Sequence, residues 1–197
     1  MAPHSISSSA SEKAELRRAA LLRRDALDPE ARRSGALAVA EWAMAVAGLS
    51  DAALVGAFWP IRSEVDPRPL IERLFARGQR VALPKVTPDG LLFREWRAGE
   101  ALVPGAFGLS EPRDDLPALD PTALIVPLAA FDRRGHRVGY GRGYYDRAIA
   151  RLSRLGPVLT IGIAFSAQEI ARVPSEPHDR PLDHVVTEAG PVSLIEA

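Results

Sequence analysis

Apolar positions along the chain follow two different patterns. Short, continuous apolar runs typical of buried strands alternate with longer segments in which apolar residues recur every three or four positions, as they do in helices. The clearest strands are ALVGAF at residues 53–58 and VLTIGIA at residues 158–164. Strands that alternate with helices predict an α/β fold: a single three-layer αβα domain with a largely parallel sheet and helices at its amino terminus.

Capping residues mark where the predicted helices begin and end. Ser9 and Glu12 have capping-box spacing before a first helix. Asp28-Pro29 and Asp66-Pro67 are helix starts, and Gly48 and Gly78 end those two helices. Further helices are predicted over 144–155 and 167–172. The first helix carries basic residues that we expect at the surface: Arg17, Arg18, Arg23 and Arg24.

Prolines divide the remaining strands from their loops. Strands are predicted over 80–83, 91–96, 123–126 and 184–187, with Pro84 and Pro127 ending two of them because proline has no N–H to donate. Residues 98–121 are rich in Gly, Pro and Asp and are expected to be mostly loop. Ligands in such folds bind beyond the carboxyl ends of the strands. The loops after Phe58, Leu83 and Val126 should therefore meet at a ligand site.

Composition narrows the classes of function. With 197 residues, we expect a disordered tail at 1–10 and one domain over 11–197. The net charge of zero argues against a nucleic-acid partner, and no apolar run is long enough for a membrane span. The lack of cysteine excludes disulfides, thiolate catalysis and cysteine-bound metals. The polar amino terminus has no signal-peptide pattern, and the early acidic residues Glu12, Glu15 and Asp25 favour a cytoplasmic protein over one with a transit peptide. A monomer is expected.

The stretch GYGRGYYD, residues 139–146, is the strongest chemical signal in the sequence. Glycines that lead into a helix allow backbone N–H groups to approach an anion such as phosphate. Arg137 and Arg142 could bind phosphate oxygens, and Asp146 could hold a divalent cation. Only Lys13 and Lys85 are lysines among 25 basic residues, which favours a special task for each, such as phosphate binding.

Two common nucleotide-binding motifs do not fit this stretch. A P-loop requires a lysine and a hydroxyl residue after its last glycine. A dinucleotide fingerprint requires GxGxxG near the first strand and a carboxylate about 20 positions later. The residues alone leave open a glycine-rich turn whose tyrosines pack in the core.

The longer run FDRRGHRVGYGRGYYDR, residues 131–147, closely resembles the signature of the 5-formyltetrahydrofolate cyclo-ligase family, also called 5,10-methenyltetrahydrofolate synthetases. Further matches follow in order over about residues 12–187: Lys13-x-x-x-Arg17, Pro60-x-x-x-Glu64, Leu83-Pro84 and Glu176-Pro177-His178-Asp179. The resemblance implies the conversion of 5-formyltetrahydrofolate to 5,10-methenyltetrahydrofolate, with ATP as co-substrate and Mg2+ as cofactor, and the release of ADP and phosphate.

The resemblance also implies roles for individual residues. Arg142 is the expected catalytic residue, and Asp146 and Asp179 are the expected Mg2+ ligands. The ATP-binding set is Lys13, Arg17, Arg137, Val138, Gly139, Tyr140, Gly141, Arg142, Gly143, Tyr144 and Tyr145. The folate-binding set is Trp59, Glu64, Tyr140 and Tyr144.

Several alternatives remain open at the level of sequence. Asp183 rivals Asp179 as the second carboxylate, and Lys85 could face either the site or solvent. Trp42 and Trp96 are interpreted as structural. His136, His178 and His184 lack the spacing of a metal site. The protein could also be a relative that binds folate or another phosphorylated ligand without cyclo-ligase activity, or a non-catalytic interaction domain.

Overall fold

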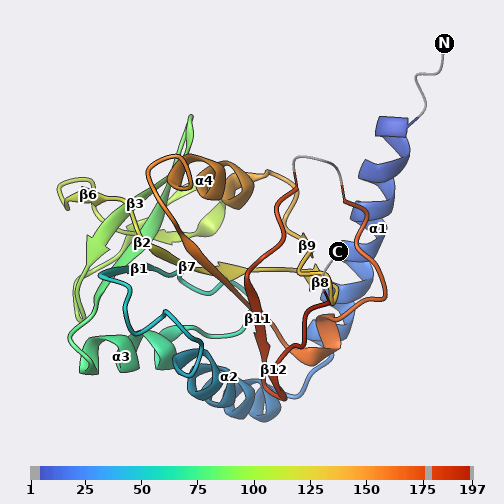
Figure 1. Ribbon diagram of the computed structural model, residues 1–197, viewed down its shortest axis with the longest axis horizontal. Coiled ribbons are helices and arrows are strands. Elements are labelled where there is room, and N and C mark those ends of the chain that lie inside the picture. The colour runs from blue at the N-terminus through green and yellow to red at the C-terminus, as the bar shows by residue number, and fades with distance from the viewer. Residues whose placement is uncertain (1–4, 176–178, 196–197) are drawn as a thin grey trace.

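The computed structural model describes residues 5–175 and 179–195 of the chain. Within these residues, an eight-stranded sheet runs through the centre in the order β12-β11-β10-β7-β1-β2-β3-β6 (Figure 1). Its strands, in chain order, are β1 (Leu54–Gly56), β2 (Arg80–Thr87), β3 (Gly90–Trp96), β6 (Ala118–Leu119), β7 (Ala123–Pro127), β10 (Leu159–Ile163), β11 (His184–Thr187) and β12 (Gly190–Pro191).

The five central strands are parallel. β11, β10, β7, β1 and β2 pair side by side in the same direction. β12 and β3 pair antiparallel to their neighbours, and β6 adds to β3 at the sheet edge. The predicted α/β class with a largely parallel sheet is confirmed.

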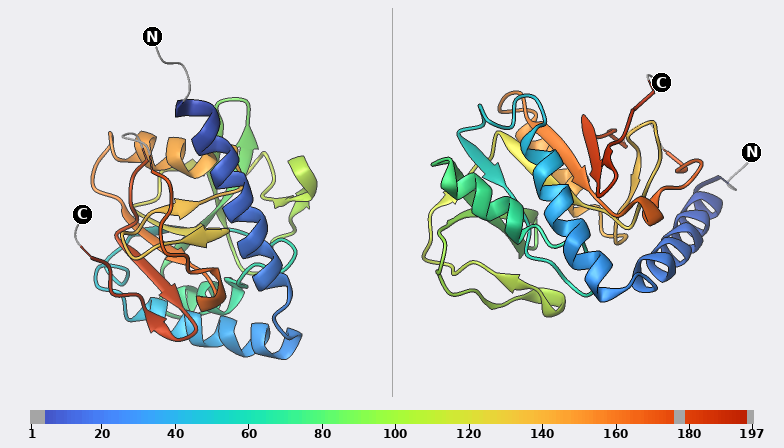
Figure 2. Two further views of the ribbon diagram at one scale, coloured as in Figure 1. Left: turned by 90° about the vertical axis from the view of Figure 1, so that its right-hand side faces the viewer. Right: turned by 90° about the horizontal axis from the view of Figure 1, so that it is seen from below.

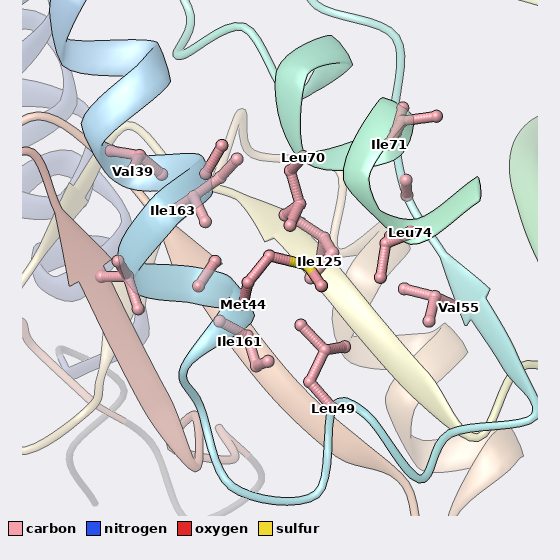
Figure 3. Packing of buried hydrophobic residues seen from close by; sticks show 14 of the residues in the cluster. Val39, Met44, Leu49, Val55, Leu70, Ile71, Leu74, Ile125, Ile161 and Ile163 are labelled. Carbon is pink, nitrogen blue, oxygen red and sulfur yellow. The ribbon is translucent and has the colours of Figure 1, made fainter. Parts of the chain in front are cut away.

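Successive side chains of a strand point to opposite faces of the sheet. Both faces of this sheet are apolar, and helices cover both. In β7, Ile125 packs with α2 (Pro29–Met44) and α3 (Arg68–Ala76) on one face (Figure 3). Leu124 and Val126 point to the other face, where α4 (Tyr144–Leu152) contributes Ile149 and Leu152. The predicted three-layer αβα arrangement is confirmed.

Helix α1 (Ser5–Asp25) lies beside the sheet rather than over one of its faces (Figure 2). It packs against the short 3-10 helix η2 (Ser166–Gln168) and the hairpin of β8 (Ala130–Phe131) and β9 (Arg137–Val138). The helix begins at Ser5, before the capping box at Ser9. The division into a tail over 1–10 and a domain over 11–197 stays a prediction.

The structure differs from the predicted elements mainly at their ends. β2 continues through Pro84, because β1 ends opposite Ala82 and the later part of β2 pairs only with β3. Proline is tolerated where a strand has one neighbour. Pro127 is likewise the last residue of β7. The last predicted helices are shorter: α4 ends at Leu152, and η2 replaces a helix over 167–172.

The segment predicted as loop over 98–121 contains short elements of its own. They are β4 (Val103–Pro104), η1 (Ala106–Gly108), β5 (Ser110–Glu111) and β6. β4 and β5 form a two-stranded hairpin, and η1 lies at its turn. Strands of two residues are too short to show an apolar periodicity in the sequence, so these elements depend on tertiary contacts.

Candidate active site

A pocket of about 300 Å3 opens at the carboxyl ends of β1, β2 and β7. Phe58 and Trp59 line it after β1, Pro84 and Val86 line it from the end of β2, and Pro127 lines it at the end of β7. The glycine segment 139–146 and the turn of the β4–β5 hairpin complete the wall. The three strand ends singled out in the sequence therefore meet at one pocket, as predicted.

Two of the glycines in the glycine segment are required by the backbone conformation. Gly141 has φ +90° and Gly143 has φ +60°, which is the left-handed region that side chains disfavour. Gly143 directly precedes α4, so the segment ends at a helix amino terminus. Gly139 has no such conformation, and a Cβ added there would meet nothing within 4 Å. The space beside its Cα is therefore open, which leaves room for a ligand to approach.

One face of α1 carries cationic side chains toward this region. The Lys13 ammonium lies 2.6 Å from an Asp179 carboxylate oxygen. Nε of Arg17 donates to the Gly139 carbonyl over 2.6 Å. The expectation that Arg24 lies at the surface is wrong, because its side chain is only 2% exposed.

The position of Arg24 on α1 explains its burial. Eleven residues make slightly more than three helical turns, so Arg24 lies on the same face as Lys13. Ala20, between them on this face, is also buried. The spacing of Lys13, Arg17 and Arg24 was therefore the signal in the sequence that could have identified Arg24.

Two of the predicted carboxylates flank a buried arginine. The Arg137 guanidinium pairs with Asp146, and it also donates to the Arg180 carbonyl over 3.1 Å. Burial lowers the pKa of Arg137, while the negative charges of Asp146 and Asp179 oppose this shift. Asp146 and Asp179 thus both act on one cation. Their rival Asp183 is engaged elsewhere, since its carboxylate accepts from the backbone and hydroxyl of Thr160 over 2.7 Å each.

The donor set limits how a divalent cation could bind. Over residues 5–175 and 179–195, no group of three or more histidine or acidic side chains could hold a metal alone. Magnesium commonly uses one or two carboxylates and completes its shell with phosphates and water. Asp146 and Asp179 fit that role if a phosphorylated ligand supplies the remaining oxygens.

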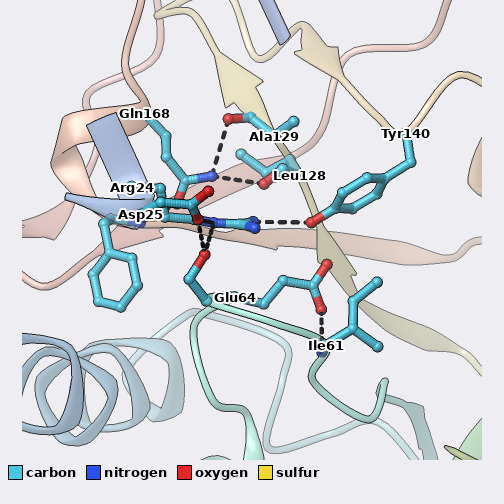
Figure 4. A network of polar contacts seen from close by, with 10 residues as sticks. Arg24, Asp25, Ile61, Glu64, Leu128, Ala129, Tyr140 and Gln168 are labelled. Carbon is cyan, nitrogen blue, oxygen red and sulfur yellow. Dashed lines mark hydrogen bonds and ion pairs between the residues drawn. The ribbon is translucent and has the colours of Figure 1, made fainter. Parts of the chain in front are cut away.

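Glu64 also lines the pocket, and it lies within a network of polar contacts (Figure 4). One carboxylate oxygen accepts the Ile61 N–H over 2.9 Å. Burial raises the pKa of Glu64, and the Tyr140 hydroxyl, the Ile61 hydrogen bond and the positive charges of Arg24 and Arg62 partly offset this rise. Desolvation of its hydroxyl and the negative charge of Glu64 raise the pKa of Tyr140.

The aromatic residues divide between the pocket and the core. Trp59, Tyr144 and Tyr145 line the pocket. Trp96 is buried against Trp59, with ring centroids 5.6 Å apart, and Trp42 is partly exposed on α2 outside the pocket. The prediction that tyrosines would border the site agrees with this placement, although Tyr144 and Tyr145 also pack against the core.

Arg142 is exposed at the pocket mouth, where its guanidinium lies 4.0 Å from the ring centroid of Phe107. Phe107 has φ +59°, a strained value for a side chain of this size. Phe107 is not among the predicted site residues, because nothing in the loop PGAFG distinguishes it from any exposed aromatic residue.

Four other candidates lie apart from the pocket wall. Lys85 points away from it, since Pro84 and Val86 face the pocket; its ammonium lies 2.9 Å from Asp114. Val138 is buried in β9, and His184 belongs to β11. His136 is half-buried, and burial lowers its pKa. Residues Glu176, Pro177 and His178 lie outside the described residues.

Among the described residues, no helix is both long and apolar enough to cross a membrane.

The 5-formyltetrahydrofolate cyclo-ligase family matches residues 9–188 of the chain. The chain belongs to this family. The matched residues include α1 from residue 9 onward and the residues that line the pocket.

Curated relatives support this membership over nearly their full length. The 5-formyltetrahydrofolate cyclo-ligase of Escherichia coli K12 is 36% identical over 172 residues, which cover 84% of this chain and 94% of the relative. The cyclo-ligase of Mycolicibacterium smegmatis is 35% identical over 187 residues, covering 89% and 93% of the two chains. The chain is thus a member of an enzyme family.

Solved structures agree with the fold. The NMR structure of the Aquifex aeolicus 5,10-methenyltetrahydrofolate synthetase has a TM-score of 0.78 and 31% identity, with 94% of each chain covered. The synthetase from Mycoplasma pneumoniae has a TM-score of 0.72 at 23% identity, covering 90% of this chain and 99% of that one; it supports the fold alone. The cyclo-ligase family predicted from the glycine segment is confirmed.

Proposed function

We propose that this cyclo-ligase family member converts 5-formyltetrahydrofolate to 5,10-methenyltetrahydrofolate, using ATP with Mg2+ and releasing ADP and phosphate. The observation that carries the proposal is that the glycine segment and Glu64 line the same pocket. An anion-binding wall and a buried carboxylate that can accept N–H bonds thus face one cavity. A triphosphate and a pterin ring could therefore lie next to each other in it.

The chemistry explains why such a pocket is needed. The oxygen of a formamide is a poor leaving group, because it would have to depart as oxide or hydroxide, and amide resonance makes the formyl carbon a weak electrophile. Transfer of the γ-phosphoryl group of ATP to this oxygen converts it into a leaving group. N10 of the folate then attacks the formyl carbon, the five-membered ring closes, and phosphate departs. Positioning and charge stabilisation supply most of the catalysis in phosphoryl transfer.

The side chains around the pocket divide this work. Lys13, Arg17 and Arg137 are the phosphate-binding cations, with the backbone of 138–145 against the nucleotide. Arg142, exposed and stacked on Phe107, can turn toward the transferring phosphoryl group and stabilise its charge. Glu64 accepts N–H bonds from the pterin, while Trp59, Tyr140 and Tyr144 border its flat ring.

Asp146 and Asp179 are the residues that would hold Mg2+. The cation supplies positive charge to the phosphate oxygens when it is bound with ATP. In the protein alone, Arg137 and Lys13 neutralise the two carboxylates. Phosphate oxygens can replace the carboxylates as partners of these cations when nucleotide and cation arrive together.

The decisive experiment is to follow the absorbance band of the methenyl product after mixing the protein with 5-formyltetrahydrofolate, ATP and Mg2+. We expect a rise that requires all three additions. No rise from protein shown to be folded by circular dichroism would overturn the proposal. Titration with a fluorescent ATP analogue would then separate a folate- or phosphate-binding relative, which gives saturable binding, from an interaction domain, which gives none.

We further place the reaction in the cytoplasm, because the chain has no cysteine and ATP is abundant there. All assigned residues come from one chain, which favours a monomer as the working unit. Sedimentation at the enzyme concentrations of the assay tests the monomer.

A further inference from the structure

Arg24 is buried in a part of the protein where its charge needs an explanation. Its side chain is only 2% exposed, and it is not among the residues that line the pocket. Fully buried arginines are rare unless they are paired. Its nearest carboxylate contact is to Asp25, at 3.9 Å, and Asp25 is itself 58% exposed. Within the described part of the chain, Arg24 is therefore a buried cation at the end of α1 without a close, buried ion-pair partner.

Two hydrogen bonds form two routes from Arg24 toward Glu64. Its guanidinium donates to the Tyr140 hydroxyl over 2.9 Å (Figure 4), and that hydroxyl counteracts the rise in the pKa of the Glu64 carboxylate. Because Tyr140 accepts from Arg24, its own proton is left for another acceptor. Nε of Arg24 also donates over 2.9 Å to Ser63, the residue before Glu64. Ser63 in turn donates to Asp25, which fixes the direction of both bonds.

The charge of Arg24 also acts on Glu64. Four titratable groups interact with this carboxylate: Arg24 from α1, Arg62 from its own loop, and Tyr140 and Tyr145 from the glycine segment and α4. Burial raises the pKa of Glu64, whereas both arginines and the Tyr140 hydroxyl counteract that rise. Arg62 lines the pocket, but Arg24 does not. Arg24 is thus the cation that can act without meeting a ligand.

We propose that Arg24 is a positioning residue for the substrate-binding carboxylate: through Tyr140 and Ser63 it orients Glu64 for the pterin. The inference rests on the proposed function. It also gives α1 a second task, since Lys13 and Arg17 on the same helix face are the proposed phosphate contacts. One helix then supports the nucleotide at its middle and the folate at its carboxyl end.

The test compares Arg24→Met with Arg18→Met in steady-state assays. Both variants remove one positive charge from α1, but Arg18 is exposed and lies outside the pocket. For Arg24→Met we expect the KM for 5-formyltetrahydrofolate to rise about 10- to 100-fold, the loss typical of a hydrogen bond to a charged group. The KM for ATP should change less than about threefold, and Arg18→Met should match the wild type.

A double-mutant cycle with Glu64→Gln separates positioning from a general structural role. If Arg24 acts through Glu64, adding Arg24→Met to Glu64→Gln should cause little further loss in kcat/KM for the folate. Additive losses, or equal changes in the two KM values, would overturn the proposal. The acid limb of kcat/KM for the folate should also move to higher pH in Arg24→Met, because Glu64 loses a cation that favours its ionised form. If the acid limb of Arg24→Met coincides with that of the wild type, the proposal is wrong.

A milder variant keeps the test decisive if Arg24→Met does not fold. Ser63→Ala removes one of the two routes without touching the pocket wall. We expect a 2- to 10-fold rise in the folate KM that disappears in the Glu64→Gln background. An unchanged folate KM would overturn the inference while leaving the reaction intact. A wild-type protein that forms no methenyl product would instead refute the proposed function.

Discussion

The hydroxyl of Tyr145 gives a prediction in which stability and ligand binding move in opposite directions. Tyr145 lies in the first turn of α4 and lines the pocket. Its hydroxyl is buried and has no hydrogen-bond partner among the described residues. Burial also raises the pKa of this phenol, so it stays neutral and offers one donor. A group of this kind destabilises a ligand-free protein and becomes useful once a ligand supplies an acceptor.

The expected magnitude follows from the cost of an unmade hydrogen bond. A buried polar group without a partner costs about 1–3 kcal/mol. Tyr145→Phe removes the oxygen and little volume, so we expect the ligand-free protein to gain about 1 kcal/mol in its free energy of unfolding. For a chain of this size, that gain raises Tm by about 2–4 °C. The KM for ATP should rise about 2- to 10-fold, the usual worth of a neutral hydrogen bond.

Thermal unfolding by circular dichroism without ligands and steady-state kinetics measure the two effects. Tyr144→Phe is the matched control for stability, because the hydroxyl of Tyr144 is not among the buried groups without a partner in the described chain. We expect its Tm to match the wild type. A lower Tm for Tyr145→Phe would mean that its hydroxyl is satisfied within the protein. A higher Tm with unchanged KM values would refute the ligand role.

Three further predictions concern the segment around the glycines. Arg142→Ala should lower kcat about 100-fold or more and leave the folate KM nearly unchanged; a change confined to KM would assign Arg142 to ground-state binding. Gly141→Ala forces a side chain into φ +90° near Arg17 and should lower the free energy of unfolding by about 1–2 kcal/mol, whereas Gly139→Ala should unfold like the wild type. Both variants should raise the KM for ATP. An unchanged KM in Gly139→Ala would contradict the phosphate cradle. Although burial opposes it, hydrogen bonds from backbone N–H groups and an arginine hold the pKa of Asp132 below its usual value. The protein should therefore lose stability in urea as pH falls from about 4 toward 2, and Asp132→Asn should flatten this slope; parallel curves for the two proteins would refute it.

Local signals in the sequence were sufficient for the fold class. Continuous apolar runs predicted β7 and β10, and Asp28 caps α2 as predicted, with its carboxylate accepting the Glu30 N–H over 2.8 Å. These features depend on neighbours within a few residues, and such neighbours are visible in the sequence. The ends of β2 and α4 were misjudged because strand and helix ends depend on which partners lie alongside.

The sequence by itself determined the family, the positions of the glycines and the identity of the chemical groups. Only the tertiary structure decided which of them meet. Lys13 and Asp179 are 166 positions apart yet form an ion pair, and Asp183 is bound to Thr160 instead. Arg24 is one arginine among many in the sequence, and its burial follows from contacts with Ser63 and Tyr140, far away along the chain. Helix periodicity can place such side chains on one face, but what that face meets depends on how the chain packs.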